Sequence, residues 1–381
     1  MFLNFKISNY RSLGKELTID FSIRDRQKLG ACAEVNDQAI NSIACLVGPN
    51  ASGKSNILKG IVQFLNWASK SYALPFHRGG FTPHFCCAGL PTSFSTEFID
   101  KANQYKYEVS ILDNVVQKEI LQKRDESTKR YSYLFNRKAE KKEISFASSI
   151  KINMQDITRL GDEMSLLSLL LELNYFEKND FLILRKFDTN LFDQDTIVNL
   201  NDLSLMLQND NILLDELIEE LKTIDTGISS LDLKKSKERF TILAKHKIAS
   251  KDYPLTLLEE STGTMHYIEI FISLFKVLQN GGIFIADELE QSLHPDLTGR
   301  IINRFMNKDK NPNNAQLLFT THNPWFLQDL TKTQIFITEK NDAAETETIR
   351  LDEIAGVRND ENYFTKYIAG EYDGRPKIRE A

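Results

Sequence analysis

A glycine-rich run near residue 50 contains the residues whose types and spacing best suit chemistry. Gly48, Gly53, Lys54 and Ser55 follow the pattern G-x-x-x-x-G-K-S. In such a loop, glycines allow close approach to a phosphate chain, while the lysine and the hydroxyl reach the terminal phosphates and Mg²⁺. The plain alternative is a Gly- and Ser-rich turn. We predict a nucleotide-binding loop whose ligand-binding residues are Gly48, Asn50, Ser52, Gly53, Lys54, Ser55 and Asn56.

Two carboxylates far along the chain supply the acidic Mg²⁺ ligand and the base for water that the phosphate loop lacks. Asp287 and Glu288 follow Ile283–Ala286, an apolar run that predicts a buried strand. Asp287 is expected to hold Mg²⁺ together with Ser55, and Glu288 to orient or deprotonate an attacking water. An apolar run that ends in two acids is common by itself, but it becomes specific after a phosphate loop.

A histidine ends the next apolar run, Gln316–Thr321. A lone histidine at a strand end is usually structural. Here we expect this strand to lie beside the Asp-Glu strand in a parallel sheet, which places His322 at the carboxyl edge where ligands bind. His322 is therefore predicted to sense the γ-phosphate, and Lys54, Glu288 and His322 form the candidate catalytic set. His294, in the loop after Glu288, is assigned a structural role.

A further anion site is suggested by Glu260–Thr264, just before the apolar helix predicted over Met265–Leu278. Ser261 and Gly263 stand where backbone N–H groups of a helix N-terminus attract negative charge. The alternative is an ordinary helix cap by Ser261 or Thr262, and the local sequence alone favours it.

The elements that must position these residues follow from hydrophobic periodicity. The run Ile43–Val47 predicts a strand before the phosphate loop, and the residues after the loop have helical spacing. An antiparallel part is predicted from the alternating strands Phe2–Tyr10, Leu17–Phe21, Ser93–Ile99, Tyr105–Leu112, Val115–Leu121 and Tyr131–Asn136. From about Met154 to Thr223 the pattern turns helical and acidic. We predict an α/β fold divided into 1–153, a helical lobe inserted over 154–230, and 231–381.

Composition places the protein in the ordinary globular class. Its 381 residues are 41% hydrophobic and 26% charged, with a net charge of −6, so no general basic surface marks it for nucleic acid. The N-terminus lacks a signal-peptide pattern and no long apolar run is present, so we expect a cytoplasmic protein without membrane contact. Two basic stretches, Lys118–Lys142 and Leu231–Lys251, are solvated strand edges or, alternatively, a DNA contact.

Taken in order, these motifs resemble the ABC-type ATPase heads of the RecF, SMC and OLD-like group. They are most similar to stand-alone bacterial AAA-type ATPases found beside phage-defence and abortive-infection effectors. The matching stretches are Ile7–Leu13 (the group's N-terminal motif, including Arg11), Gly48–Ser55 (Walker A), Glu260–Thr264 (a shortened signature), Asp287-Glu288 (Walker B), His322 (switch histidine) and the tail Tyr367–Ile378. The signature is E-S-T-G-T rather than L-S-G-G-Q, and no Q-loop glutamine is assigned between Trp67 and Leu90.

The resemblance implies an ABC-head fold that binds ATP and Mg²⁺ and hydrolyses ATP. Two subunits would sandwich two ATP molecules, so that Ser261 and Gly263 act across a homodimer or higher oligomer, and Arg11 would join the nucleotide site. The expected function is a switch that controls a separately encoded effector, for example a nuclease, in anti-phage defence. Alternatives are a RecF- or SMC-like DNA clamp and an ATP-bound scaffold with negligible turnover. About 60 residues follow His322, too few for the nuclease domain of OLD-type relatives.

Overall fold

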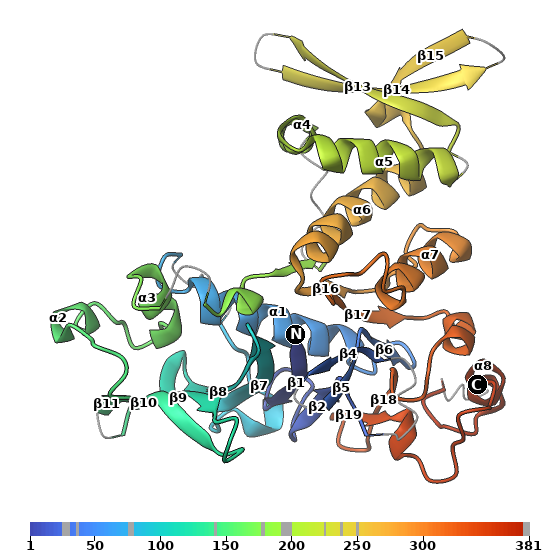
Figure 1. The fold of residues 1–381 in the computed structure, drawn as a ribbon. Helices are drawn as coiled ribbons and strands as arrows, with labels where there is room; N and C mark the ends of the chain where they lie inside the picture. Colours follow the sequence, from blue (N-terminus) through green and yellow to red (C-terminus); the bar gives the residue numbers. More distant parts are fainter. Residues whose placement is uncertain are drawn as a thin grey trace.

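A parallel sheet forms the centre of the protein in the computed structural model (Figure 1). The structure describes residues 1–24, 31–35, 38–74, 80–140, 143–176, 180–191, 200–224, 226–236, 239–248 and 251–375. Neighbouring strands of this sheet run parallel to each other, except for the last two, which run antiparallel. Their spatial order is β12 (Phe187–Thr189), β16 (Ile283–Ala286), β17 (Gln316–Thr321), β6 (Ile43–Val47), β18 (Ile335–Lys340) and β19 (Thr346–Arg350).

The order of these strands explains how distant motifs meet. The strand β17 lies between β6 and β16, so the strands that precede Gly48, Asp287 and His322 are direct neighbours. Since all three run parallel, their carboxyl ends meet at one edge of the sheet. The predicted α/β fold with a phosphate loop is therefore confirmed, and the expected pairing of the Asp-Glu strand with the histidine strand is observed.

The second large sheet is antiparallel and has seven strands. Their spatial order is β11 (Glu143–Phe146), β10 (Tyr131–Lys138), β9 (Val115–Arg124), β8 (Asn103–Leu112), β7 (Thr92–Asp100), β1 (Phe2–Ser8) and β2 (Leu17–Asp20). Asp113 and Asn114, with φ of 51° and 63°, turn β8 into β9, as their residue types predict for a tight hairpin. A small additional sheet contains β3 (Ser22–Ile23), β5 (Gln38–Asn41) and β4 (Ala31–Val35).

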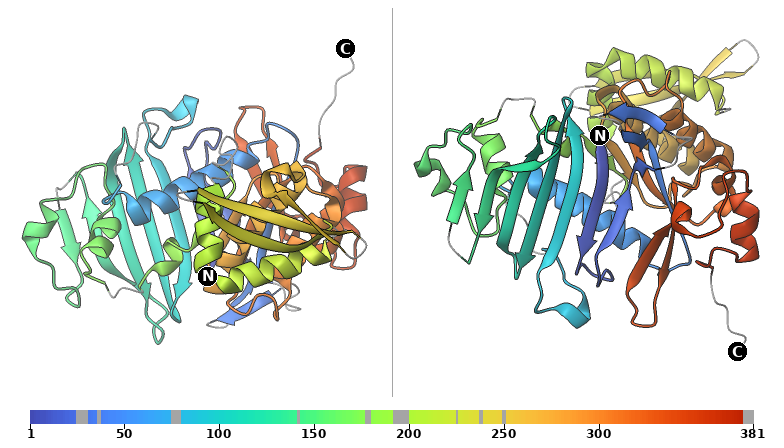
Figure 2. Two further views of the ribbon diagram at one scale, coloured as in Figure 1. Left: turned by 90° about the horizontal axis from the view of Figure 1, so that it is seen from above. Right: turned by 60° about the horizontal axis from the view of Figure 1, so that its bottom comes forward.

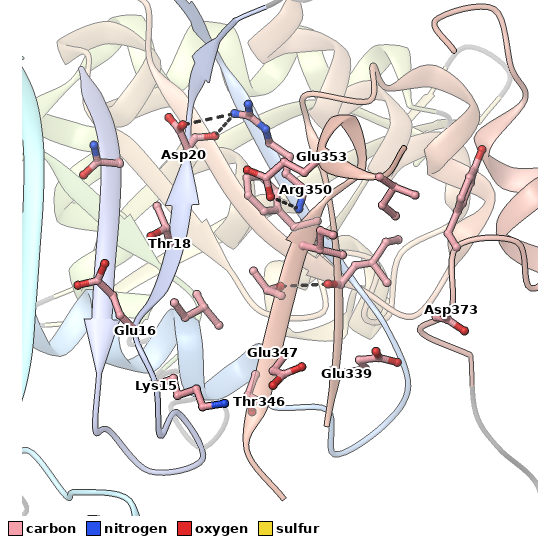
Figure 3. Close-up of a pocket in the computed structure, with 18 of the residues that line it drawn as sticks. Lys15, Glu16, Thr18, Asp20, Glu339, Thr346, Glu347, Arg350, Glu353 and Asp373 are labelled. Carbon is pink, nitrogen blue, oxygen red and sulfur yellow. Dashed lines mark hydrogen bonds and ion pairs between the residues drawn. The ribbon is translucent and has the colours of Figure 1, made fainter. Parts of the chain in front are cut away.

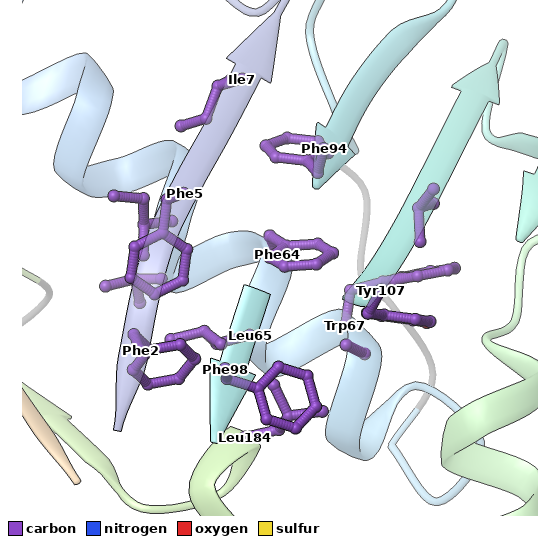
Figure 4. Close-up of a cluster of buried hydrophobic side chains, with 14 of the residues drawn as sticks. Phe2, Phe5, Ile7, Phe64, Leu65, Trp67, Phe94, Phe98, Tyr107 and Leu184 are labelled. Carbon is purple, nitrogen blue, oxygen red and sulfur yellow. The ribbon is translucent and has the colours of Figure 1, made fainter. Parts of the chain in front are cut away.

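Helix α1 (Lys54–Lys70) joins the two large sheets, because it contacts β1 on one side and β16 and β17 on the other. From above it lies across the antiparallel sheet (Figure 2). Phe64 on the helix stacks on Phe94 of β7 with ring centroids 5.2 Å apart, and Trp67 is buried nearby (Figure 4). This aromatic packing fixes the helix whose first residue belongs to the phosphate loop.

The other face of the parallel sheet packs on α6 (Thr262–Asn280) and α7 (Pro295–Met306). Alternate residues of β6 divide between the two faces. Ala44 and Leu46 belong to the core around α1, whereas Ile43, Cys45 and Val47 belong to the core around α6 and α7. Burial on both faces explains why this strand is apolar throughout rather than alternating.

The elements of 154–230 lie in separate places. Helices α2 (Met154–Ile157) and α3 (Leu166–Glu172) lie beside the antiparallel sheet, and the buried leucines of α3 join the core around α1. The strand β12 joins the parallel sheet. Helices α4 (Leu200–Asn209) and α5 (Asn211–Thr223) join the core around α6 instead. These helices are thus distributed over both cores, while the division of the chain at 153 and 230 stays a prediction.

A three-stranded sheet projects from the body above α4 and α5 (Figure 1). It consists of β13 (Ile228–Ser236), β14 (Arg239–Ile248) and β15 (Lys251–Thr256). We refer to these strands with α4 and α5 as the projecting lobe. No described helix is long and apolar enough to cross a membrane.

Candidate nucleotide-binding site

The phosphate loop connects the end of β6 to the start of α1. Gly53 is the N-cap of α1 with φ 106°, a left-handed conformation that favours glycine. A Cβ atom at Gly53 would lie 1.9 Å from the Thr346 side-chain oxygen, and one at Gly48 would lie 2.0 Å from the Thr338 carbonyl oxygen. Both glycines of the motif are therefore required by close packing against β18 and β19.

The loop is held from outside by hydroxyl groups that the motif does not contain. The Thr346 hydroxyl donates to the Ser52 carbonyl at 2.8 Å and lies 2.8 Å from the Ser12 hydroxyl. The Asn56 amide donates to Ser12 Oγ at 2.8 Å. Ser12 thus links the N-terminal motif to the loop. The neighbouring Arg11 packs its guanidinium 5.5 Å from the centroid of the Tyr10 ring, and its role in nucleotide binding stays a prediction.

Lys54 is buried at the base of the loop and is 5% exposed. Its Nζ donates to the carbonyls of Gly48 and Pro49 at 2.8 and 3.0 Å. Burial lowers the pKa of Lys54, and the charges of Asp287, Glu288 and Glu290 act in the opposite direction. The pairing of β17 with both β6 and β16 places these carboxylates at the same edge of the sheet as the lysine, so two distant parts of the sequence share one site.

Asp287 is positioned by two residues that the motifs did not identify. The Thr320 hydroxyl donates to Asp287 Oδ1 at 2.6 Å. The Asn190 side chain, just after β12, donates to the Asp287 carbonyl at 2.9 Å and accepts from the Asp287 N–H at 2.8 Å. The only signal in the sequence that could have identified Thr320 was its place two residues before His322. No signal in the sequence pointed to Asn190.

Glu288 and His322 face each other at the same edge. Their Oε1 and Nε2 atoms are 3.3 Å apart, and both side chains are partly exposed. The Glu288 N–H donates to Thr320 Oγ1 at 2.7 Å, and the His322 N–H donates to Glu290 Oε1 at 2.6 Å. The backbone of both residues is thus fixed while their side chains stay accessible. His294 caps α7, accepting from the Asp296 N–H at 3.3 Å, which agrees with its predicted structural role.

The signature residues begin α6. Ser261 is the N-cap, and its hydroxyl accepts the Thr264 N–H at 3.1 Å. Glu260 just before it lies 2.6 Å from His246 of β14. Among the described residues, neither Ser261 nor Gly263 lines the pocket beside the phosphate loop. The cap predicted as the simpler alternative is therefore present, and a role of these residues across a dimer stays a prediction.

A pocket of about 750 Å³ opens beside the loop. Its lining comprises loop residues 48–52, His322 and residues from the C-terminal part of the chain, whereas Lys54, Ser55, Asp287 and Glu288 are not among the lining residues. Ser52 is 2% exposed and its hydroxyl has no hydrogen-bond partner. An unpaired buried hydroxyl is unusual and suits a loop that binds a polar ligand.

The residues present also fit Mg²⁺ bound together with a nucleotide. In the part of the chain that the structure describes, no three His, Cys, Asp or Glu side chains gather as a metal site. Mg²⁺ needs fewer protein ligands when substrate phosphates and waters complete its shell. Ser55 and Asp287 supply one hydroxyl and one carboxylate, which suits that mode of binding.

A larger groove of about 1080 Å³ separates β1 and β2 from β18 and β19 (Figure 3). Arg350 bridges the two sheets, donating to the carbonyls of Asp20 and Ser22 at 2.9 and 2.8 Å. Carboxylates such as Glu16, Glu339 and Glu347 line the groove. Its lining contains more carboxylates than lysines and arginines and no residue of the phosphate loop, so the smaller pocket beside the loop is the candidate nucleotide site.

Comparisons with known proteins found similar solved structures and one matching family profile. Among solved structures, the SMC head domain from Thermotoga maritima is 12% identical, with a TM-score of 0.42 over 92% of this chain and 98% of that chain. The SmcHead bound to the C-winged helix domain of ScpA is 12% identical, with a TM-score of 0.46 over 91% and 96%. Curated protein sequences give no significant match. A family profile described as "AAA domain, putative AbiEii toxin, Type IV TA system" matches residues 43–327. Because this profile covers most of the chain, the protein belongs to that AAA-domain family, as the resemblance to abortive-infection ATPases predicts.

Proposed function

We propose that the protein is a Mg²⁺-dependent ATPase that works as a dimerising switch for a separately encoded effector in anti-phage defence. The observation that carries the proposal is the meeting of Lys54, Asp287, Glu288 and His322 at one edge of the parallel sheet. A lysine, two acids and a histidine around a phosphate loop are the groups that ATP hydrolysis uses. The family description, which names a "putative AbiEii toxin", supports the link to defence.

Each residue has a defined part in the proposed chemistry. Lys54 and the loop N–H groups bind the phosphates, and Ser55 and Asp287 hold Mg²⁺, which neutralises phosphate charge when bound. Glu288 accepts a proton from the attacking water, with His322 beside it as the sensor of the terminal phosphate. Thr320 fixes the direction of Asp287.

The proposed dimer places Ser261 and Gly263 of one subunit against the nucleotide of the other. Ser261 is exposed at the start of α6, where a second copy could reach it. The Glu288→Gln variant should bind ATP without hydrolysing it and accumulate the dimer. Light scattering should show an ATP-dependent doubling of mass for this variant and none for Lys54→Ala. A mass that does not change with ATP would contradict the sandwich.

The effector is proposed to be a different protein. We expect that the purified chain, incubated with DNA, Mg²⁺ and ATP, leaves the DNA intact, because the D-x-D motif of the OLD-type nuclease does not occur in the residues after His322. Magnesium-dependent cutting that is lost in the Asp287→Asn variant would show that the chain itself is the effector.

A DNA clamp is the second candidate, favoured by exposed lysines on the projecting lobe. Lys234 and Lys247 are exposed there. Lys245, by contrast, pairs with Asp232 at 2.7 Å, and Lys237 lies outside the described residues. DNA affinity that falls steeply with salt and is lost on charge reversal of Lys234 and Lys247 would favour the clamp. Binding unaffected by that reversal would exclude this surface.

A further inference from the structure

The tail motif singled out in the sequence packs beside the phosphate loop. Its helix α8 (Tyr363–Ala369) contacts the 3-10 helix η4 (Pro324–Asp329), which begins two residues after His322. Trp325 of η4 and Phe364 of α8 meet edge to face with centroids 5.6 Å apart. The tail is thus attached to the segment that carries the switch histidine. Residues 376–378 of the motif lie outside the described part of the chain.

Two glycines turn the chain after α8. Gly370 ends the helix with φ 86°, and its N–H donates to the Tyr367 carbonyl at 3.0 Å. Gly374 has φ 68°, and a Cβ there would lie 2.4 Å from the Ile337 side chain of β18. The buried Tyr367 hydroxyl donates to the Gly374 carbonyl at 2.7 Å. The motif residues therefore fix the backbone that presents Arg375.

Arg375 lines the pocket together with the loop residues Asn50, Ala51 and Ser52 and with His322. Its side chain is exposed, and no ion-pair partner for it is found in the described ranges. Lys340 and the single carboxylate Glu339 also line this pocket. A planar guanidinium that has no acidic partner among the described residues and lines the same pocket as a phosphate loop is well suited to a phosphate oxygen pair.

We propose that Arg375 binds the terminal phosphate of the bound nucleoside triphosphate. The inference rests on the proposed ATP site and adds to it a cation of the tail motif to which the sequence analysis assigned no role. The terminal phosphate is the expected target because Arg375 lines the same pocket as His322, the proposed sensor of that phosphate. The tail would then contact ATP but not ADP, and the packing of α8 on η4 would connect nucleotide state to the C-terminal part of the protein.

Calorimetric titrations of the full chain with AMPPNP and with ADP, both in the presence of Mg²⁺, test the assignment. Arg375→Ala should weaken AMPPNP binding roughly tenfold, because a charge-assisted hydrogen bond is lost, and should leave ADP binding unchanged. Arg358→Ala is the matched control, since Arg358 is exposed in the same C-terminal part and does not line the pocket. Tyr367→Phe, which removes the contact to Gly374, should weaken AMPPNP selectively and to a smaller extent.

The outcomes separate this inference from the ATP proposal. If Arg375→Ala binds AMPPNP as the Arg358→Ala control does, or loses AMPPNP and ADP equally, the assignment of Arg375 is wrong while the ATP site stands. If the unmodified chain binds neither AMPPNP nor ADP, both proposals are wrong. Unchanged melting temperatures of Arg375→Ala and Arg358→Ala show that affinity, rather than folding, is compared.

Discussion

The carboxyl edge of the parallel sheet and the projecting lobe differ in the kind of side chain that they leave exposed. At the edge, Thr320 and Asn190 hold Asp287 in place, while the side chains of Glu288 and His322 stay accessible. On the lobe, β15 is almost entirely exposed, and its apolar Tyr253 and Leu255 are 48% and 42% exposed. Fixed groups beside a pocket suit chemistry, whereas exposed apolar groups on an edge strand suit contact with another molecule.

Because of this difference, we expect substitutions in the two regions to have different effects. Changes of Glu288 or His322 at the edge should remove ATP chemistry and preserve folding, because these two side chains are accessible. Changes on the surface of the lobe should preserve ATP chemistry. The exception is the buried charge cluster that attaches the lobe to the body, where substitution should affect stability.

The largest effect is expected for Glu288→Gln. Loss of the general base should reduce phosphate release roughly 10²- to 10⁴-fold, measured with a coupled phosphate assay. Glu172→Gln, an exposed residue on α3, is the control and should behave like the unmodified protein. Equal phosphate release from Glu288→Gln and the unmodified protein would support the scaffold with negligible turnover.

The second largest effect is expected when the charge cluster around Glu220, which attaches the projecting lobe to the rest of the protein, is broken. Glu220 of α5 accepts from Arg300 at 2.7 Å and also bonds Arg304 of α7 and Tyr267 of α6. Glu220→Gln should lower the free energy of unfolding by about 2 kcal/mol, because the partly exposed Arg300 and Arg304 lose the buried carboxylate that pairs with them. Denaturant unfolding measures this loss. Glu219→Gln at the exposed neighbouring position should change little.

The same cluster predicts an acid dependence. Burial alone would raise the pKa of Glu220, but hydrogen bonds from Arg300 and Tyr267 and the charge of Arg304 hold it below its ordinary value. The ionised form is therefore favoured in the folded state. Its stabilisation is complete above the unfolded pKa and is lost as pH falls through the folded pKa. Unfolding curves of the unmodified protein and Glu220→Gln should converge toward low pH, and a constant difference would contradict this.

A smaller effect is expected for Thr320→Val, which removes the hydroxyl that orients Asp287. Residues that orient a metal ligand typically affect activity by about 10- to 100-fold. The predicted result is a reduced phosphate-release rate with an increased Mg²⁺ requirement. Thr320→Ser keeps the hydroxyl and should restore most of the activity. Failure of serine to restore it would indicate that packing, rather than the hydrogen bond, is important.

The smallest effect is expected on the lobe surface. Charge reversal of Lys234 and Lys247 should change ATP hydrolysis in the absence of DNA by less than about twofold, because neither residue lies at the edge of the parallel sheet. A larger loss would show that the lobe and the edge are coupled.

How much could be predicted from the sequence differed between these regions. The phosphate loop, the Asp-Glu pair and His322 were found because each follows an apolar strand within a short motif. Thr320 and Asn190 were not assigned, because they act by pairing with residues distant in sequence. The same holds for Ser12 and Thr346, whose hydroxyls meet only in the folded protein.

For secondary structure too, features that depend on residues distant in sequence were not predicted. The strand β12 is short and only partly buried, so its pairing with β16 gave no signal of periodicity. The exposed β15 lacks the alternation that marks a half-buried strand. The helices of 154–230 were recognised as helices, but their distribution over two cores depends on tertiary packing that a local pattern does not contain.

The central claim is that Lys54 and the two acids form one pocket for a magnesium-bound triphosphate. Isothermal titration of the unmodified protein with ATP and Mg²⁺ tests it most directly, alongside Lys54→Ala and the control Lys59→Ala on the same helix. We predict saturable binding for the unmodified protein and Lys59→Ala, and binding weakened roughly 100-fold for Lys54→Ala. No heat of binding in the unmodified protein, or equal affinity in Lys54→Ala, would contradict the account.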